Sequence, residues 1–291
     1  MIYTLQQALN ALQLGSLYAL IALGYTMVYG VLTMINFAHG DVFMVGAFVA
    51  CLTARHLGLP FVPVLLIAMA ATALLGASLE RVAYRPLRNA PKMSSVITAL
   101  GCGLVLENVT LWKYPYPQTF PPLLANRGFH FAGLFVSSVQ ILIVGIAAAL
   151  MVGLDLLVRR SKWGLAMRAV SWDRAIVPLM GVPVDRVISV TFAIGAALGG
   201  AAGVLYGVAY PVIDPSMGVL VGWKAFISAV VGGIGNLRGA MLGGFILGGL
   251  EVMVAAFLPS TYRDFVAFTL LLVLLVVRPH GLLGRPIPQK V

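Results

Sequence analysis

The chain has 291 residues, of which 60% are hydrophobic and only 10% are charged, and its mean hydropathy is +0.99. Soluble domains carry about 25% charged residues, so this composition excludes an ordinary water-soluble protein. The net charge of +10 is typical of basic cytoplasmic loops in a membrane protein, and no nucleic-acid partner is expected. The long apolar runs predict an all-α, polytopic transmembrane helical bundle of about eight or nine spans, and not a barrel.

The apolar runs are separated by short polar connections. The first run is expected to be a retained span, because no Lys or Arg precedes it and no cleavage site is evident. The predicted spans cover residues 9–34, 42–57, 60–80, 94–112, 138–158, 187–210, 218–234, the run from the 235–239 turn to 258, and the run from the 259–264 loop to 277. The polar interruptions at 34–41 and 210–218 are each a full connection or a re-entrant half-helix.

The basic residues are distributed unevenly between the two ends of these spans. With the N-terminus outside, fourteen of the nineteen Lys and Arg lie in loops 81–92, 159–186, 235–239 and the tail after 277. The positive-inside rule therefore places these segments, and the C-terminus, in the cytoplasm. The other five fall outside: Arg55, Lys113, Arg127, Lys224 and Arg263.

The segment 159–186 is the most polar part of the chain, and it holds eight of the 28 charged residues. Within it, residues 172–180 are expected to form a short amphipathic helix that ends at Gly181 in a left-handed cap. Pro178 should kink that helix or shorten it to a turn or two. Attraction to anionic membrane lipid is one interpretation. The apolar residues at helical spacing favour a protein partner: Ala175, Ile176, Leu179 and Met180.

Four glycines repeat at a strict four-residue spacing after that segment: Gly195, Gly199, Gly203 and Gly207. Residues four apart share one helix face, and small residues allow helices to approach closely in lipid. This face is expected to pack against helices of the same chain or to form a subunit interface.

Polar residues inside the apolar runs are candidates for a substrate path. The sequence Asn36-Phe-Ala-His39-Gly40-Asp41 marks a helix break, and Asp41 is expected to be the N-cap of a helix from Val42. A proton relay through His39 and Asp41 is an alternative. Glu107, Asn108 and Glu251 are expected to make interhelical hydrogen bonds, with path lining as the second interpretation.

A short internal similarity favours transport. Tyr29-Gly-Val-Leu, a break and Gly46 parallel Gly203-Val-Leu-Tyr, a break and Gly218 and Gly222, in helices predicted to run in opposite directions. Antiparallel copies of a helix–break–helix unit are common in transporters, so an inverted repeat is a possible arrangement.

The sequence contains no set of residues typical of an enzyme. It has four scattered histidines, no Gly-x-Ser-x-Gly and no paired metal ligands. Cys51 and Cys102 form no spacing pattern, so no disulfide framework or metal site is expected. Because no Gly-x-x-x-x-Gly-Lys-Ser/Thr loop is present, any use of ATP requires a partner.

Four stretches now identify a family resemblance: residues 24–48, 167–207, 226–251 and 260–285. In their order and spacing they resemble the permease subunits of bacterial branched-chain amino-acid ABC importers, of the type typified by the first of that system's two permeases. Glu107-Asn108 and Glu251 also look like family residues. In one departure, Ile176-Val-Pro178 stands where the family usually has alanine-rich sequence before Leu179-Met-Gly.

The resemblance implies that residues 1–291 form one permease domain in the bacterial inner membrane, with 159–186 as the loop that couples it to an ATPase. The implied partners are a second related permease, two cytoplasmic ATPases that bind ATP and magnesium, and a periplasmic binding protein. Whether the permeases form a homodimer or a heterodimer stays open. The implied coupling residues are Arg168, Asp173, Arg174, Leu179, Gly181, Asp185 and Arg186.

The expected function is therefore inward transport of branched-chain or similar hydrophobic amino acids, powered by separate subunits. The alternatives are a related importer for urea, short amides or other small acids, and a self-sufficient proton-coupled transporter using His39, Asp41 or Glu251. A structural membrane scaffold is disfavoured by the broken helices.

Overall fold

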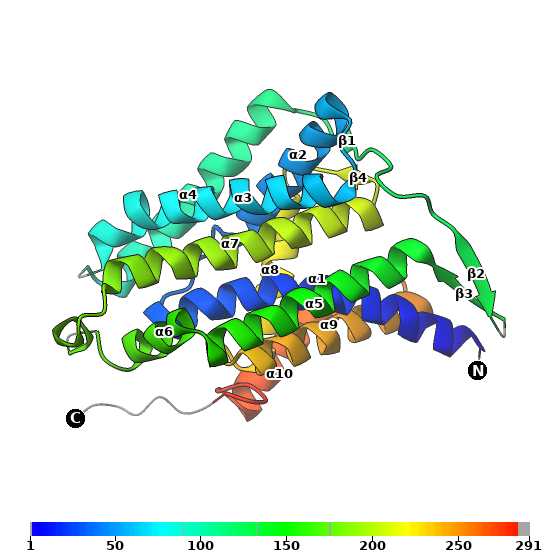
Figure 1. Cartoon of the computed structure of the whole chain (residues 1–291). Helices are drawn as coiled ribbons and strands as arrows, with labels where there is room; N and C mark the ends of the chain where they lie inside the picture. The colour runs from blue at the N-terminus through cyan, green and yellow to red at the C-terminus, as the bar shows by residue number, and fades with distance from the viewer. Residues whose placement is uncertain (1, 89, 132, 175, 285–291) are drawn as a thin grey trace.

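The computed structural model describes residues 2–88, 90–131, 133–174 and 176–284. The end of the predicted cytoplasmic tail, 285–291, lies outside the described residues, as does Ala175. The α-helices in the described ranges are α1 (Ile2–Leu32), α2 (His39–Leu57), α3 (Phe61–Leu79), α4 (Lys92–Lys113), α5 (Ser138–Arg160), α6 (Lys162–Trp172), α7 (Val184–Ala209), α8 (Met217–Gly232), α9 (Leu237–Phe257) and α10 (Tyr262–Val277) (Figure 1).

Short elements lie at the two ends of the bundle. A π-helical turn η1 (Glu80–Tyr84) and a 3-10 turn η2 (Arg85–Leu87) continue α3, and a second 3-10 turn η3 (Val177–Met180) follows α6. The described residues contain two antiparallel strand pairs: β1 (Gln118–Thr119) with β4 (Val212–Ile213), and β2 (Gly128–Phe131) with β3 (Leu134–Ser137). The β2–β3 hairpin and the N-terminus lie at one end, and α6 lies at the other (Figure 1).

Seven of the described helices are long and apolar enough to cross a membrane: α1, α2, α3 with its continuation, α4, α5, α7 and α9. The remaining two predicted spans correspond to α8 and α10, which have 16 residues each. This confirms the all-α polytopic bundle. Most boundaries lie within a few residues of their predicted positions, although α1 begins at Ile2 instead of near residue 9.

The start of α2 differs from the prediction. The helix begins at His39, its N-cap is Ala38, and Asp41 lies in the first helical turn. The assignment of Asp41 as the N-cap is therefore wrong. The reason is tertiary packing, because the backbone of Gly40 and the ring of His39 lie against glycines of α1, α7 and α8, which extends the helix by a turn.

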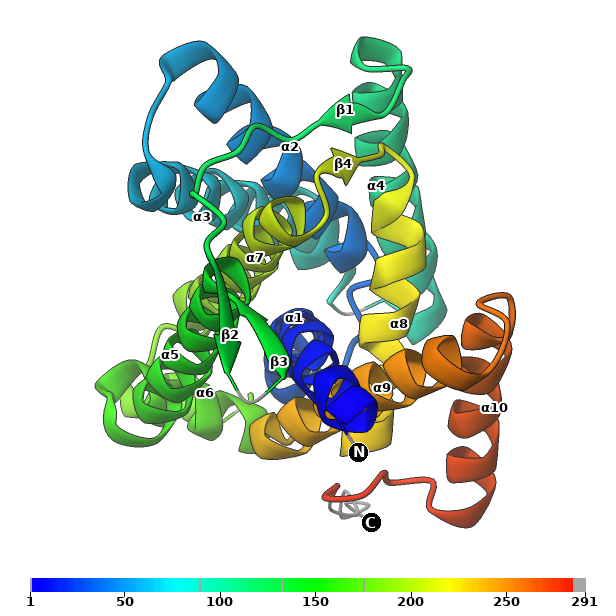
Figure 2. The same cartoon turned by 90° about the vertical axis from the view of Figure 1, so that its right-hand side faces the viewer.

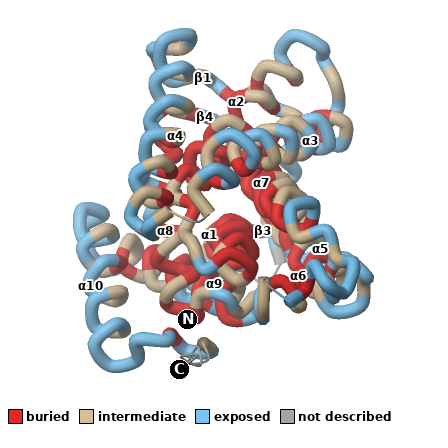
Figure 3. Tube along the Cα trace, turned by 90° about the vertical axis from the view of Figure 1, so that its left-hand side faces the viewer, coloured by how far each residue is buried: buried red, intermediate tan, exposed pale blue. Residues whose placement is uncertain are grey.

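The centre of the bundle is formed by α1 and α7, whose residues are mostly buried, whereas α4 and α10 are largely exposed (Figure 3). The two central helices cross at Gly24 and Gly195. A Cβ atom on Gly24 would lie 3.0 Å from the carbonyl oxygen of Gly195, so side chains are excluded at the crossing.

The predicted glycine face on α7 packs entirely within this chain. Gly195 faces α1, Gly199 faces the ring of His39, Gly203 faces the backbone of α2, and Gly207 faces the ring of Phe120. All four glycines are buried. The interpretation of this face as a subunit interface is therefore wrong, because the helices of the same chain already cover it.

The packing contacts of helices α1–α4 correspond to those of helices α7–α10. Helix α3 packs mainly on α7 while α9 packs mainly on α1, and α4 contacts α2 while α10 contacts α8. Helices α1 and α7 contact each other, as do α2 and α8. The starts of α1 and α7 lie at opposite ends of the bundle (Figure 1). This is the arrangement that an inverted repeat of α1–α4 and α7–α10 predicts.

Candidate functional site

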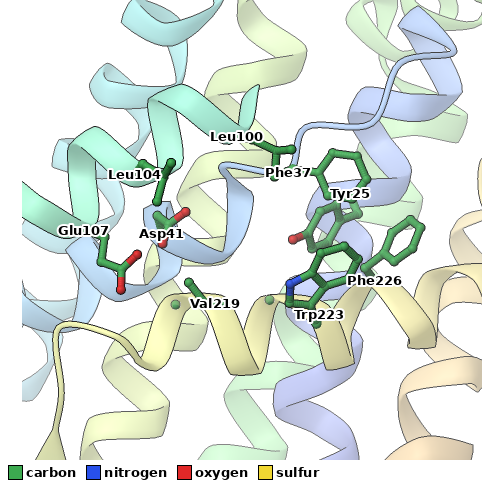
Figure 4. A pocket seen from close by; sticks show the side chains of 11 residues that line it. Tyr25, Phe37, Asp41, Leu100, Leu104, Glu107, Val219, Trp223 and Phe226 are labelled. Atoms are coloured by element: carbon green, nitrogen blue, oxygen red, sulfur yellow. The ribbon is translucent and has the colours of Figure 1, made fainter. Parts of the chain in front are cut away.

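A cavity of about 260 Å³ lies where the starts of α2 and α8 meet beside α4. In Figure 2, α4 and α10 flank α8 on the same side of the bundle. The cavity combines four aromatic side chains, two carboxylates, apolar residues and glycines. Figure 4 shows its lining residues: Tyr25, Phe37, Asp41, Leu100, Leu104, Glu107, Gly218, Val219, Gly222, Trp223 and Phe226.

Glycine is required where the two helix starts approach each other. A Cβ atom on Gly222 would lie 2.9 Å from the Cα of Gly40, and one on Gly218 would lie 2.9 Å from the carbonyl oxygen of Gly40. Contacts this short with backbone atoms cannot be relieved by rotating a side chain. The sequence therefore brings two broken helices into direct backbone contact within the bundle.

Asp41 lies in this contact zone with an incompletely satisfied carboxylate. Its side chain is 6% exposed, and its Oδ1 atom is buried with no hydrogen-bond partner among the described residues. A Cβ atom on Gly218 would lie 2.7 Å from that oxygen, and Gly103 of α4 flanks the other oxygen. A buried carboxylate oxygen without a donor is costly and is retained mainly at functional positions.

The opposite wall of the cavity is aromatic. The ring of Phe37 lies 5.5 Å from that of Trp223 and 5.6 Å from that of Phe226, measured between centroids. Tyr25 is 6.1 Å from Phe226 and belongs to the same wall. Phe37 comes from the break before α2, so this break and α8 together form the wall.

Not all of the predicted path residues reach this cavity. Asp41 and Glu107 line it, and Gly40 supports it from behind. Asn36 instead accepts a buried hydrogen bond of 2.7 Å from the Tyr84 hydroxyl.

His39 is also placed away from the cavity. It is buried between α1 and α7 against Gly24 and Gly199. Its Nε2 atom has no hydrogen-bond partner in the described part of the chain.

The three predicted interhelical residues have different roles. Glu251 makes the expected bonds, because its carboxylate accepts from the Tyr18 hydroxyl at 2.5 Å and pairs with Lys224. Asn108 instead donates to the carbonyl of Leu104 in its own helix, and Glu107 lines the cavity. For these two, the expected hydrogen bonds to other helices are not among those that the structure describes.

Lys224, which was expected to fall on the outer face, lies within the predicted span 218–234 as part of α8. Its side chain is buried, and it pairs with Glu251 and also with Asp264 at 2.8 Å. The structure satisfies the ammonium group with two carboxylates from α9 and α10, which allows it to be buried.

The predicted coupling segment, residues 159–186, contains a longer helix than expected. That helix lies before residue 172 instead of after it. Helix α6 ends at Trp172, and a four-residue 3-10 turn containing Pro178 follows, so the single helix over 172–180 is wrong. The shortening by Pro178 and the left-handed cap at Gly181, with φ of 78°, are confirmed. Asp173 lies at the end of α6 and accepts a hydrogen bond from the amide of Ile176.

Two charged residues hold this segment against the membrane domain. Arg174 donates through Nη2 to the carbonyl oxygen of Val31 at 2.9 Å, at the end of α1. Burial lowers the pKa of Arg174, and nearby Arg88 lowers it further. Asp185 accepts hydrogen bonds from Arg85 and Arg88.

These attachments continue toward the break before α2. Arg88 also pairs with the fully buried carboxylate of Glu80, which begins η1, and the last residue of η1 is Tyr84. Because Tyr84 bonds to Asn36, the segment is connected both to the end of α1 and to the break at 33–38 itself. Arg168 donates within the same end of the molecule, to the carbonyl of Val158, while Arg186 is exposed.

The outward side of the coupling segment is apolar. Its large side chains are strongly exposed: Trp172 at 80%, Ile176 at 56%, Leu179 at 85% and Met180 at 77%. A cluster of exposed apolar residues on a connecting segment is typical of a surface that another protein covers.

Several residues of the candidate site were missed by sequence reasoning. The Trp223–Phe226 pair had a usable signal, because two aromatics three apart on a glycine-rich helix share one face. Tyr84 and Arg88 had no usable sequence signal, because they lie in a segment predicted as a basic loop. Their hydrogen-bond partners Asn36 and Asp185 are far away in the sequence. The described residues contain no group of three or more His, Cys, Asp or Glu that could hold a metal ion.

The chain matches, over residues 7–275, the family described as branched-chain amino acid transport system permease component. It is 44% identical to the high-affinity branched-chain amino acid transport system permease protein BraD of Pseudomonas aeruginosa, over 99% of this chain and 98% of that one. It is 42% identical to the protein of the same description, LivH, from Escherichia coli K12, over 100% and 98% of the two chains.

The fold is also similar to a solved structure, PsaBC from Streptococcus pneumoniae in complex with Fab. The TM-score is 0.50 at 14% identity, and the match covers 93% of this chain and 91% of that chain. At this identity the likeness concerns the fold alone. The near-complete family match and the seven long apolar helices lead to one conclusion: the chain is a multi-pass membrane protein that belongs to the family of branched-chain amino acid transport permease components.

Proposed function

We propose that this chain is a permease subunit of an ATP-binding-cassette importer that moves branched-chain amino acids inward across a bacterial inner membrane. A second, related permease subunit completes the path, two cytoplasmic ATPases bind ATP and magnesium, and a periplasmic protein delivers the substrate. The N-terminus is outside and the C-terminus is in the cytoplasm. The relatives named for branched-chain amino acid transport support the substrate class.

The observation that carries this function is the construction of the coupling segment. It presents an apolar outer side, and Arg174 and Asp185 attach its inner side to two parts of the membrane domain. A loop that only attracted lipid would need neither feature. A docked ATPase that moved this segment would pull on the end of α1 and on η1, and both lead to the break before α2.

The substrate path runs along the side of the bundle that contains the cavity. Asp41 and Glu107 together would be costly against hydrocarbon, so this side must be covered by protein or line a water-filled space. The second permease subunit is the natural cover, and the path then lies between the two permeases.

Reconstitution tests the proposed function directly. Proteoliposomes that contain both permeases and both ATPases should accumulate leucine, isoleucine and valine only when ATP and the binding protein are supplied. Uptake by this chain alone without ATP would establish a self-sufficient transporter instead. Preferential uptake of urea or a short amide would overturn the substrate class.

The docking surface needs a separate test with an internal control. Replacing Leu179 by Asp places a charge in the apolar contact, so the ATPase should no longer co-purify with the permease. Lys162→Gln changes the charge on the same cytoplasmic face outside that contact and should leave co-purification unchanged. Normal recovery of the ATPase with Leu179→Asp would refute the docking surface.

A further inference from the structure

We infer that the cavity between α2, α4 and α8 is a substrate subsite, in which Asp41 and Glu107 bind the ammonium group of an amino acid and the Trp223 and Phe226 rings contact its apolar side chain. This inference rests on the proposed function, and it places substrate recognition inside the permease itself. The ligand class it specifies is a single small molecule that carries an ammonium group and a hydrophobic side chain.

The acidic end of the cavity lacks a positive partner. Asp41 is 6% exposed and its buried Oδ1 has no hydrogen-bond partner within the ranges described. Glu107 of α4 adds a second carboxylate, and the lining of the described cavity contains no Lys or Arg. The buried Lys224 is already paired with Glu251 and Asp264. A cation that enters from outside the chain would satisfy this end.

The other end of the cavity suits an apolar group. In Figure 4 the two carboxylates lie at one end, and Tyr25, Trp223 and Phe226 lie at the other. A ligand that fits both ends has a cationic group and a hydrophobic group separated by a short distance. Ligand pockets for drug-sized molecules occupy about 300–1,000 Å³, so a cavity of about 260 Å³ holds one small molecule.

A metal ion is the other cation to consider, and the donor set does not favour it. Asp41 and Glu107 are joined by no third His, Cys, Asp or Glu in the described ranges, and the remaining lining is aromatic or aliphatic. A divalent ion requires more oxygen ligands than these two carboxylates supply.

Cysteine protection tests the subsite. The reporter is Leu104→Cys, which lines the cavity, in a background where Cys51 and Cys102 are replaced by alanine in the complete reconstituted importer. Val105→Cys is the matched control, because it is exposed on the same helix but does not line the cavity. Labelling by a thiol reagent is followed with L-leucine, with 3-methylbutan-1-amine, which lacks the carboxylate, or with 4-methylpentanoate, which lacks the ammonium group.

Leucine and the amine should slow labelling at residue 104 but not at residue 105, and the acid should not slow it. Asp41→Asn should raise the leucine concentration for half-protection by about tenfold, because a charge-assisted hydrogen bond is lost. Equal protection by the acid, unchanged protection in Asp41→Asn, or no protection at all would overturn the subsite. ATP-driven leucine uptake alongside such a result would leave the proposed function intact, whereas absent uptake would count against that function separately.

Discussion

The two broken helices of this protein are packed alike but held in place by different bonds. The break between α1 and α2 is attached by side chains, since Asn36 accepts from Tyr84 and Val31 accepts from Arg174. The break between α7 and α8 is attached by backbone, since β4 pairs with β1 and the amide of Phe120 donates to Pro211.

The difference connects each break to a different end of the bundle. The first is attached to the elements that carry the coupling segment. The second is attached to the 114–137 connection at the end of the molecule that holds the N-terminus (Figure 1). An inverted repeat therefore gives two equivalent helix starts at one cavity, each connected to an opposite face. In the proposed importer these faces meet the ATPase and the binding protein.

Substitution at the contact between the starts of α2 and α8 should have the largest effect on stability and uptake. Gly40→Ala places a Cβ against the backbone of Gly218 and Gly222, so we expect destabilisation of about 3 kcal/mol and loss of uptake. Gly101→Ala is the control, because no described atom lies within 4 Å of its added Cβ. Thermal unfolding in detergent measures both, and similar melting temperatures would refute the required close contact.

Deleting one atom, the hydroxyl oxygen of Tyr84, removes the side-chain hydrogen bond that holds the first break. Tyr84→Phe leaves the buried amide oxygen of Asn36 without its donor, at a cost of about 1–3 kcal/mol. We also expect less uptake per ATP hydrolysed, because the break is then less firmly coupled to η1. Tyr3→Phe, which removes an exposed hydroxyl, serves as the control. Unchanged stability and an unchanged uptake per ATP hydrolysed in Tyr84→Phe would show that this hydrogen bond does not couple the break to η1.

Removing the hydrogen-bonded turn at Asp214, in the second break, should destabilise the protein less. Asp214 accepts through Oδ1 from the amide of Ser216 at 2.8 Å, and Asp214→Ala should cost about 1 kcal/mol. Asp214→Asn retains an acceptor oxygen and should behave as wild type. We expect Asp214→Ala to reduce stimulation by the binding protein while ATPase co-purification stays normal. The comparison fails if the ATPase is lost instead.

The smallest effect is expected at the exposed end of the coupling segment's attachment. Asp185 and Arg85 are each 51% exposed, and Arg88, the second partner of Asp185, keeps its pair with Glu80, so Asp185→Asn should cost about 1 kcal/mol, and less at high salt. Asp155→Asn, which removes the pairs of another carboxylate with Arg159 and Arg238, is the reference. Melting temperatures at low and high salt measure both. A loss well above 1 kcal/mol would mean that Asp185 carries much more of the attachment.

Sequence reasoning was reliable where the signal is local. Hydrophobic run length predicted the spans, Pro178 and Gly181 predicted the shortened turn, and glycine spacing predicted the packing face of α7. It failed at Asp41 and at the 172–180 helix. In both cases a local preference was overridden by partners from distant elements.

By itself, the sequence determined that this protein is a helical membrane bundle with two breaks and a basic segment, because burial in lipid constrains every span individually. Only the tertiary structure decided that Asp41 meets Gly218, that aromatic rings from a break and from α8 face two carboxylates, and that Arg174 reaches α1. These contacts join residues far apart in the chain, and their geometry depends on how tilted helices cross. The cavity therefore exists only once both halves are packed together.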